Sequence, residues 1–473
     1  MRLAYILRNS TPERPSLSLV TSEVIARLRS RGARVEPMVP EEAPSDPVRA
    51  RPVAACRCSV RREGPVKGLK AVVFGAGKMA CGLLGHLLAR SGYEILFVAR
   101  RREVVEAINR HHGYRLIVTG EHAARLAVRN CAALSFEHEA RVFEAVAAAD
   151  VVLTGVGIAN LSEISPLIAE GLWQRSQAYG VPCLNVVACE NLPGAGAYMR
   201  HLIVSAAPLR KAMAVDSVGG FSAALTRRIM TGGGLEDGQL TFAVDAMAEG
   251  NADLAIDLNG LKDPLPLLER TLFTEEFPAL VLRKLFLLNC AQAVVAYLGY
   301  REGCHFMHEA AVHPHVAPVV KGAVGEARAA LEAEFPHKRQ AIRQDAAQAL
   351  AQIRKPELAD TVSRVARDPR RKLSPRERLV GPARLAARHH VPHDNLCVAI
   401  AAALAYDDPG DAQAVAMQRA ITAESVDKVL TEDCGLLPHE DLARAVKQEW
   451  LAILRRATPP GSLMGATLEK AVR

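Results

Sequence analysis

The stretch from Leu69 to Arg102, LKAVVFGAGKMACGLLGHLLARSGYEILFVARRR, decides the fold of this chain. It predicts a buried strand, a glycine turn, an apolar helix and a second buried strand, the order that opens a dinucleotide-binding α/β fold. Strand-like runs separated by helical stretches follow at YRLIVTG, DVVLTGVG and VPCLNVVACEN. This alternation predicts a parallel sheet that reaches to about Asn191.

Within this stretch Gly75, Gly77 and Ala80 occupy the positions of a G-x-G-x-x-G/A motif, and Lys78 and Met79 precede the alanine. The first glycine of such a motif makes the tight turn, and the second lets backbone N–H groups approach a pyrophosphate. The small third residue lets the helix pack closely on the strand. The motif therefore predicts a nucleotide site at these five residues. The alternative is a glycine turn that serves only packing.

The end of the second strand predicts which nucleotide binds. A site specific for NAD usually carries Asp or Glu there, about 20 residues after the glycines, to bind the ribose hydroxyls. Here Ala99 is followed by Arg100 and Arg101. Because a guanidinium binds phosphate bidentately, the pair favours NADP over NAD. The alternative is a solvated basic cap on the strand end.

The length of 473 residues indicates more than one domain. We expect a small βαβ extension of unknown role at 1–40, a linker at 41–66, the dinucleotide-binding domain at 67–264 and a mostly α-helical domain at 265–473. The linker is expected because its stretch is rich in Pro, Arg and Glu without periodicity. The helical domain is expected because apolar residues recur there at helical spacing.

The composition narrows the class of protein. A hydrophobic share of 49% and a charged share of 23% are typical of a soluble globular protein. No uninterrupted apolar run approaches the ~20 residues that cross a bilayer, and the N-terminus does not resemble a signal peptide, so we expect a cytoplasmic protein. The net charge of +8 is spread, and an aromatic share of 4% leaves few stacking platforms for bases. A small anionic ligand is therefore favoured over nucleic acid.

One apolar segment, RKLFLLNCAQAVVAYLGY (Arg283–Tyr300), carries three polar side chains, Lys284, Asn289 and Gln292. At about 100° per residue of an α-helix, Asn289 lies about 140° and Gln292 about 80° around the helix from Lys284, so all three project toward one side. They form a candidate catalytic cluster. The alternative is that the three side chains satisfy one another or nearby backbone.

Four motifs in order resemble the polyol-specific long-chain dehydrogenases, most closely the members that act on mannitol 1-phosphate. The resemblance covers roughly residues 67–455, and its motifs are the glycine-turn segment, VACENLPG, RKLFLLNCAQAVVAYLGY and VARDPRRKLSPRERLVGPARLA. It implies a zinc-independent oxidoreductase with a Rossmann domain and a helical domain that enclose the substrate between them. It also implies a catalytic lysine at Lys284 and substrate-binding asparagines at Asn289 and Asn191. Gln292 stands where the family has histidine.

Hydride transfer at an alcohol carbon requires side chains of these types. Moving a hydride to or from a secondary alcohol carbon requires an acid or base for the proton and fixed donors for the charge on oxygen. We expect Lys284 to act as that acid or base, because Leu285, Leu287 and Leu288 provide the kind of desolvated site that can lower the pKa of a lysine. Gln292 can hydrogen-bond a hydroxyl but cannot carry charge, so either the substrate differs from the family's or activity is reduced.

Two further clusters are weaker. The run RRKLSPRER places Arg371, Lys372 and Arg378 beside an expected helix start at Ser374–Pro375, and family members that act on sugar phosphates have a similar run, so we assign the three to a substrate phosphate. The alternative is a solvated basic face. The run CHFMHEAAVHPH could bind a metal by residue type, but its spacing matches no tetrahedral site and the family that the chain resembles uses none, so we expect ordinary interface histidines and no metal. Its candidate ligands are Cys304, His305, His308, His313 and His315.

The sequence thus predicts an NADP-linked dehydrogenase, monomeric or homodimeric, that interconverts a polyol phosphate and a ketose phosphate, such as mannitol 1-phosphate and fructose 6-phosphate. A dehydrogenase for a different polyol or keto sugar is the first alternative, because of Gln292. A nucleotide-binding protein without catalysis is the second.

Overall fold

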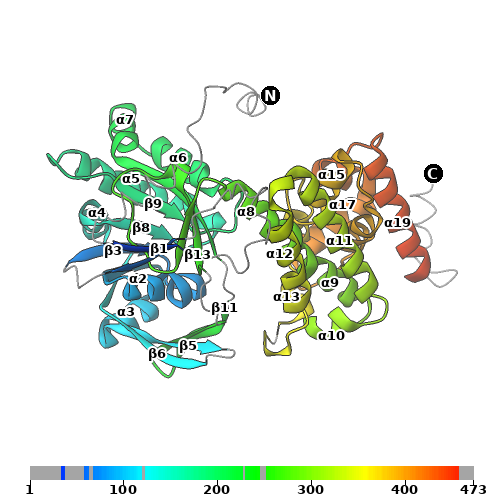
Figure 1. Ribbon diagram of the computed structural model, residues 1–473, viewed down its shortest axis with the longest axis horizontal. Helices are drawn as coiled ribbons and strands as arrows, with labels where there is room; N and C mark the ends of the chain where they lie inside the picture. The colour runs from blue at the N-terminus through cyan, green and yellow to red at the C-terminus, as the bar shows by residue number, and fades with distance from the viewer. Residues whose placement is uncertain are drawn as a thin grey trace, which may run out of the picture. The chain divides into compact units, whose positions relative to one another are not determined.

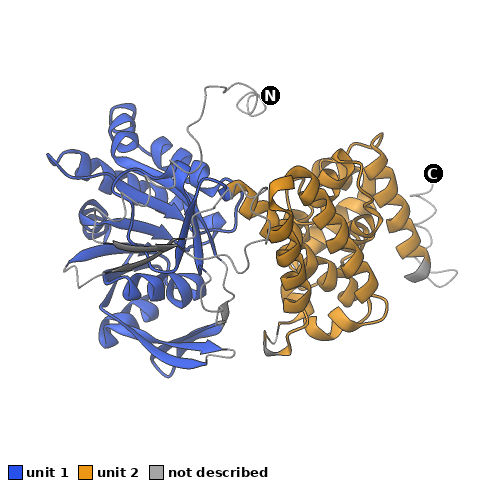
Figure 2. Cartoon of the chain, viewed as in Figure 1, with its two compact units in different colours: residues 1–277 blue, residues 278–473 orange. Residues whose placement is uncertain are grey.

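The computed structural model describes residues 33–37, 58–62, 68–119, 123–226, 230–245, 252–358 and 360–457. The chain divides into two compact units, residues 1–277 and 278–473 (Figure 2). The division falls later than the expected boundary at 264/265, because strand β14 (Thr271–Thr274) still belongs to the main sheet of the first unit.

The main sheet of the first unit has the strand order β14-β13-β10-β9-β8-β3-β4-β7. The run from β7 to β10 is parallel throughout and has the 3-2-1-4-5-6 order of a dinucleotide-binding domain, so the predicted fold class is confirmed. The parallel sheet extends past Asn191, and β13 then joins β10 antiparallel. The strands are β3 (Leu69–Phe74), β4 (Tyr93–Ala99), β7 (Cys131–Ser135), β8 (Val151–Thr154), β9 (Leu184–Ala188), β10 (Gly219–Thr226), β13 (Leu254–Asp257) and β14.

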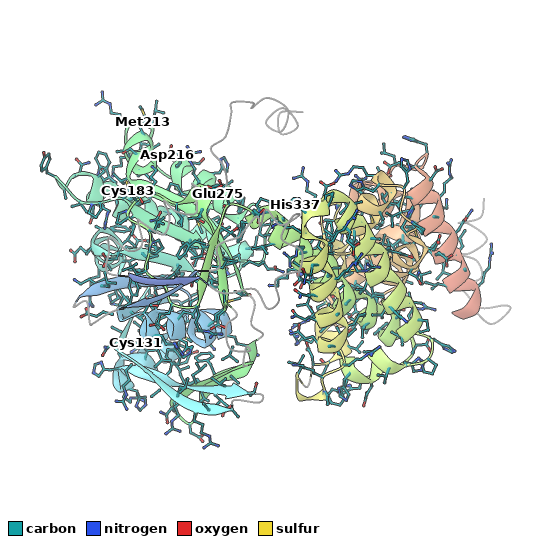
Figure 3. All side chains as sticks on the ribbon, in the orientation of Figure 1. Cys131, Cys183, Met213, Asp216, Glu275 and His337 are labelled. Carbon is teal, nitrogen blue, oxygen red and sulfur yellow. The ribbon has the colours of Figure 1, made fainter. Side chains whose placement is uncertain are left out.

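Helices lie on both faces of this sheet, with α2 and α3 on one face and α5 and α6 on the other (Figure 1). Because both faces are covered, strands β8 and β9 are buried along their whole length. Side chains fill the space between the sheet and its helices (Figure 3). The helical segments are η1 (π-helical, Ala80–Gly85), α2 (His86–Arg90), α3 (Arg102–His111), α4 (Glu139–Ala148), η2 (Ile158–Asn160), α5 (Leu161–Ser176), α6 (Ala195–Ser205), α7 (Leu209–Val218) and η3 (Leu258–Gly260).

A second sheet in this unit has the order β11-β12-β5-β6. The run YRLIVTG, expected in the parallel sheet, is strand β5 of this second sheet, and β7 takes the place beside β4. The reason is tertiary: β5 pairs with β12, which comes more than a hundred residues later in the chain, and local pattern cannot reveal such a partner. The strands are β5 (Gly113–Thr119), β6 (Ala124–Arg129), β11 (Met230–Glu236) and β12 (Gln239–Asp245).

The segment before the glycine motif also differs from expectation. Strand β1 (Ala33–Pro37) pairs antiparallel with β2 (Cys58–Arg62), so the stretch 41–66 expected as a linker contains a strand. The first strand and the helix expected within 1–40 lie outside the described residues.

The second unit is helical, as predicted. Its core gathers around α9, whose Tyr297 is fully buried. Its helical segments are α8 (Phe277–Arg283), η4 (π-helical, Lys284–Asn289), α9 (Cys290–Arg301), α10 (Met307–Val312), α11 (Ala317–Glu334), η5 (Pro336–Lys338), α12 (Arg339–Gln352), η6 (Pro356–Leu358), α13 (Val362–Ala366), α14 (Pro369–Lys372), α15 (Val380–Arg388), α16 (Asp394–Leu404), α17 (Ala412–Ala423), α18 (Val426–Glu432) and α19 (Asp441–Ala457).

Segments α8, η4 and α9 form one continuous helix, Phe277–Arg301, which is long and apolar enough to cross a membrane by length and composition, because its 18-residue apolar window has a mean hydropathy of 1.6. Its most apolar window is 67% buried inside the protein. A core helix of a soluble protein has the same two properties, and this helix packs in the core of the second unit.

Candidate active site

The glycine turn has the geometry expected of it. Gly75 follows β3 with φ +103°, and its N–H donates to the carbonyl of Val98 at 2.8 Å. A Cβ added at Gly75 would lie 2.7 Å from the carbonyl oxygen of Gly155, so only glycine fits. A Cβ at Gly77 would meet nothing within 4 Å, which leaves the backbone there open to approach. The backbone at Gly75 and Gly77 therefore leaves room for a pyrophosphate.

The helix after the turn begins at Lys78, which is exposed, and Met79, which is half-buried. The N–H of Cys81 donates to the carbonyl of Gly77 at 2.9 Å, so the preceding N–H groups at this helix start face the open side of the turn. Ala80 is buried, and a Cβ built on Gly155 would lie 3.5 Å from its Cβ. Ala80 thus packs without exposed surface beside Gly155, in keeping with the small residue expected at this position of the motif.

Sequence reasoning missed Gly85 in the same helix. A Cβ there would lie 2.2 Å from the hydroxyl oxygen of Tyr114 and 2.9 Å from the ring of Phe97. The signal was a glycine inside an apolar helix, which often marks a close approach of another element.

The two arginines stand at the carboxyl end of β4, and both side chains are more than half exposed. Arg100 forms an ion pair with Glu163 of α5 and contacts the side-chain oxygen of Asn160 at 3.5 Å. Arg101 lies 3.8 Å from the carboxylate of Glu103. Both guanidinium groups are accessible to a ligand phosphate, but a phosphate at Arg100 would compete with Glu163.

At the carboxyl end of β9, Asn191 is exposed and its neighbour Glu190 is buried. The Glu190 carboxylate accepts a hydrogen bond from the hydroxyl of Thr154 at 2.6 Å and one from the N–H of Val156 at 3.2 Å. Burial raises the pKa of Glu190, and these hydrogen bonds partly oppose the rise. Glu190 thus ties together the loops after β8 and β9 and fixes the backbone that carries Asn191. Sequence reasoning overlooked it, although a carboxylate ending an apolar strand was the signal.

In the second unit, Lys284 and Asn289 are the first and last residues of the π-helical segment η4. The N–H of Cys290 donates to the carbonyl of Leu285, five residues earlier, as a π-helix requires. Residues five apart therefore lie above one another on the same face, as residues four apart do in an α-helix. The 140° separation calculated for an α-helix is wrong for this pair. Asn289 is buried with 6% of its surface exposed, and Lys284 and Gln292 are half-buried.

Lys372 differs from its expected role. Its side chain is buried, and its ammonium donates to the carbonyls of Val365 and Arg367 and lies 5.8 Å from the centre of the Tyr297 ring. Burial, followed by the charges of Arg378 and Arg371, lowers the pKa of Lys372 to about 7. The ammonium is directed at these two backbone carbonyls, so in this arrangement Lys372 holds the chain between α13 and α14.

Arg371 and Arg378 both contact the carboxylate of Glu377. The Nε of Arg378 donates to it at 2.9 Å, and Nη1 of Arg371 lies 3.6 Å away. Arg378 is 8% exposed, and its Nη2 is buried without a hydrogen-bond partner. The helix start expected at Ser374–Pro375 is absent, because α15 begins only at Val380. Arg378 thus keeps one donor that no side chain or backbone group of the described residues satisfies.

Comparison with known proteins gives two matching family models. The mannitol dehydrogenase Rossmann domain matches residues 69–268, and the mannitol dehydrogenase C-terminal domain matches residues 278–454. The chain is similar to the mannitol-1-phosphate 5-dehydrogenase of Geobacillus thermodenitrificans, with 33% identity over 81% of this chain and 98% of the relative. Its counterpart in Bacillus subtilis is 32% identical over 79% of this chain and 97% of the relative.

Two solved structures share the fold. The mannitol 2-dehydrogenase of Pseudomonas fluorescens, in a ternary complex with NAD and D-mannitol, aligns with a TM-score of 0.63 and 14% identity, covering 85% of this chain and 94% of that one. A substrate-free D-sorbitol dehydrogenase aligns with a TM-score of 0.65 and 15% identity, covering 85% and 95%.

Proposed function

The chain belongs to the mannitol dehydrogenase family, and from this premise we propose that the oxidoreductase interconverts a polyol phosphate and a ketose phosphate, with NADP as the preferred pyridine nucleotide. The relatives at 32–33% identity are named mannitol-1-phosphate 5-dehydrogenases, which supports mannitol 1-phosphate and fructose 6-phosphate as the substrate pair. The observation that carries the proposal is the placement of Lys284 and Asn289 on one face of a π-helical turn.

In this proposal the first unit holds the nucleotide. Gly75, Gly77 and the helix start at Lys78, Met79 and Ala80 would hold its pyrophosphate, and the open backbone at Gly77 supports this assignment. Arg100 and Arg101 would hold the 2′-phosphate of the nucleotide. The strand end offers arginines where an NAD site would offer a carboxylate, which supports NADP. The bound nicotinamide supplies or accepts the hydride.

The second unit handles the proton. Lys284 gives a proton to the ketose oxygen during reduction and takes it back during oxidation, so a lysine and not zinc is the acid and base. The amide of Asn289 donates a hydrogen bond to that oxygen as charge develops on it. Gln292 holds a neighbouring hydroxyl and carries no proton.

The phosphate of the substrate is assigned to Arg378, with Arg371 as its neighbour. The unpartnered Nη2 of Arg378 supports the assignment. Glu377, which contacts both arginines, reduces the positive charge available to a dianion. Lys372 is left out because its ammonium already binds two backbone carbonyls.

A second candidate is a dehydrogenase for a different polyol or keto sugar. The observation that favours it is Gln292, an uncharged side chain on the helix that carries Lys284, where the family has histidine.

The test is a screen of NADPH consumption with phosphorylated and free ketoses and aldoses of five to seven carbons. The proposal expects phosphorylated ketoses to be reduced far faster than their free sugars, because binding a remote dianion positions the carbonyl. Equal rates on free and phosphorylated forms would rule out the phosphate site. Faster turnover of another sugar would favour the second candidate.

A further inference from the structure

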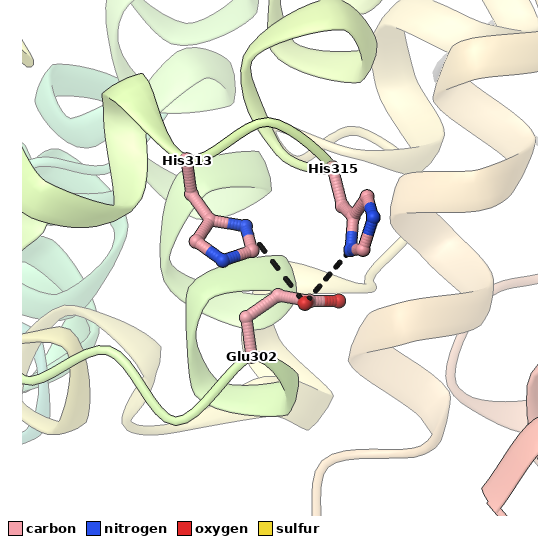
Figure 4. Close-up of side chains that lie close together, drawn as sticks. All are labelled: Glu302, His313 and His315. Atoms are coloured by element: carbon pink, nitrogen blue, oxygen red, sulfur yellow. Dashed lines mark hydrogen bonds and ion pairs between the residues drawn. The ribbon is translucent and has the colours of Figure 1, made fainter.

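A cluster outside the proposed catalytic residues brings three metal-ligating side chains together. Glu302 follows the C-terminal end of α9, and His313 and His315 lie in the connection between α10 and α11 (Figure 4). The Nδ1 atom of His315 lies 3.1 Å and that of His313 3.8 Å from the same carboxylate oxygen of Glu302. All three ligand atoms lie within 4.8 Å of one another.

The Nδ1 atom of His313 is buried and has no hydrogen-bond partner, although it faces the carboxylate. If the three side chains formed only ion pairs with one another, Nδ1 of His313 would be hydrogen-bonded to the Glu302 carboxylate, as Nδ1 of His315 is. A cation placed between the three groups would give the His313 nitrogen its missing partner and would bind the same Glu302 oxygen.

The distances suit a small transition-metal ion. Ligand atoms on one tetrahedral zinc ion lie roughly 3.3 Å apart when each bond is about 2.0–2.1 Å long. The two separations from Glu302 bracket that value, so binding requires only small side-chain movements. Two imidazoles with one carboxylate form a ligand set that zinc accepts, with water completing the shell. The His315 side chain is 77% exposed, which leaves the site open to ions from solvent.

We propose that Glu302, His313 and His315 form a binding site for a divalent transition-metal ion of the zinc type, which ties the end of α9 to the connection between α10 and α11. The site is structural and takes no part in hydride transfer. Glu302 comes 18 residues after Lys284, which corresponds to about 27 Å along a helix at 1.5 Å per residue.

The experiment titrates the tag-free, chelator-treated full chain with Zn²⁺ by calorimetry and with Co²⁺ by visible absorption. The wild type is expected to bind one more equivalent than the double variant His313→Ala/His315→Ala, and Zn²⁺ is expected to raise its thermal midpoint by mass action. Glu302→Gln keeps the side-chain volume and is expected to weaken binding at least tenfold. The matched control is His305→Ala/His308→Ala, two histidines of the same segment outside the cluster, which is expected to bind as the wild type does.

Circular dichroism shows whether each variant is folded. If the double histidine variant does not fold, the zinc affinity of Glu302→Gln tests the proposed site. Equal stoichiometry and affinity in the wild type and Glu302→Gln would overturn the site. So would a wild type that shows no zinc binding tighter than millimolar, which would leave an ordinary histidine–carboxylate ion pair.

Discussion

Lys284 and Asn289 stand one π-helical turn apart on the helix Phe277–Arg301, so that the lysine and the buried amide share one face. An α-helix of the same sequence would turn them about 140° from each other. Short π-helical segments inside α-helices occur frequently at functional sites, because they re-aim side chains at the cost of regular hydrogen bonding. The arrangement makes the two residues the first targets for mutation.

Replacing Lys284 with Ala is expected to lower kcat by about 10²-fold or more, the scale of a lost general acid or base. Nucleotide affinity should stay near the wild-type value, because the lysine acts on the substrate oxygen. Steady-state kinetics and fluorescence titration with NADPH measure the two quantities. Lys321→Ala, on the exposed face of α11, is the control and should be fully active. A Lys284→Ala enzyme with wild-type turnover would remove the proposed mechanism.

Replacing Asn289 with Asp is expected to lower kcat by about 10²–10³-fold, the effect of losing one donor to a developing oxyanion. Aspartate has nearly the same volume as asparagine, so the core can stay packed, whereas the charge contributed is of the wrong sign. Urea unfolding checks that the fold is kept while kinetics are measured. A rise in KM with unchanged kcat would instead mean that Asn289 serves ground-state binding only.

Replacing Arg100 with Asp and Arg101 with Val is expected to weaken NADPH binding by about 10- to 100-fold and to reverse the preference toward NADH, since two charge-assisted hydrogen bonds are lost. Arg102→Ala is the matched control, because Arg102 pairs with Glu106 on its own helix. Fluorescence titration with both nucleotides decides the matter.

The ion pair between Arg100 and Glu163 gives an opposite change to test. Glu163→Gln should tighten NADPH binding, because the guanidinium no longer has a competing carboxylate. NADPH affinity that is unchanged in this variant would argue that Arg100 does not contact the 2′-phosphate.

Two glycines of one turn should respond differently to the same change. Gly75→Ala is expected to destabilise the protein by about 1–3 kcal/mol or more, because its φ is +103° and the new Cβ would lie 2.7 Å from a carbonyl oxygen. Gly77→Ala meets no protein atom within 4 Å, so stability should be nearly unchanged while nucleotide affinity falls. Chemical denaturation and NADPH titration separate the two effects. Wild-type NADPH binding in Gly77→Ala would place the pyrophosphate elsewhere.

Lys372 should make stability depend on pH in a defined window. Its pKa is about 7 in the folded protein against a usual 10.5, so between these values the unfolded chain binds more protons than the native one. The free energy of unfolding therefore rises with pH across this window, and the cost of burying the charge is felt in full below it. Lys372→Met should lack the rise, which urea unfolding at a series of pH values would show. Parallel pH profiles for the two proteins would mean that Lys372 keeps its ordinary pKa when buried.

The sequence alone determined the class of fold and the position of the nucleotide turn. Gly75, Gly77 and Ala80 could be assigned because a tight turn, a close backbone approach and a close helix contact each restrict the residue at one local position. The helix with Lys284 and Asn289 was recognisable because polar side chains interrupt an otherwise apolar period. These signals are local, so no distant partner is needed to read them.

Only the tertiary structure decided the rest, because it depends on partners far away in the chain. Strand β5 has the same pattern as a strand of the parallel sheet, and its pairing with β12 alone places it in another sheet. Lys372 belongs to a basic run, and the carbonyls of Val365 and Arg367 alone turn its ammonium inward. Glu302, His313 and His315 meet because a helix end and a later loop converge, which spacing along the sequence could not show.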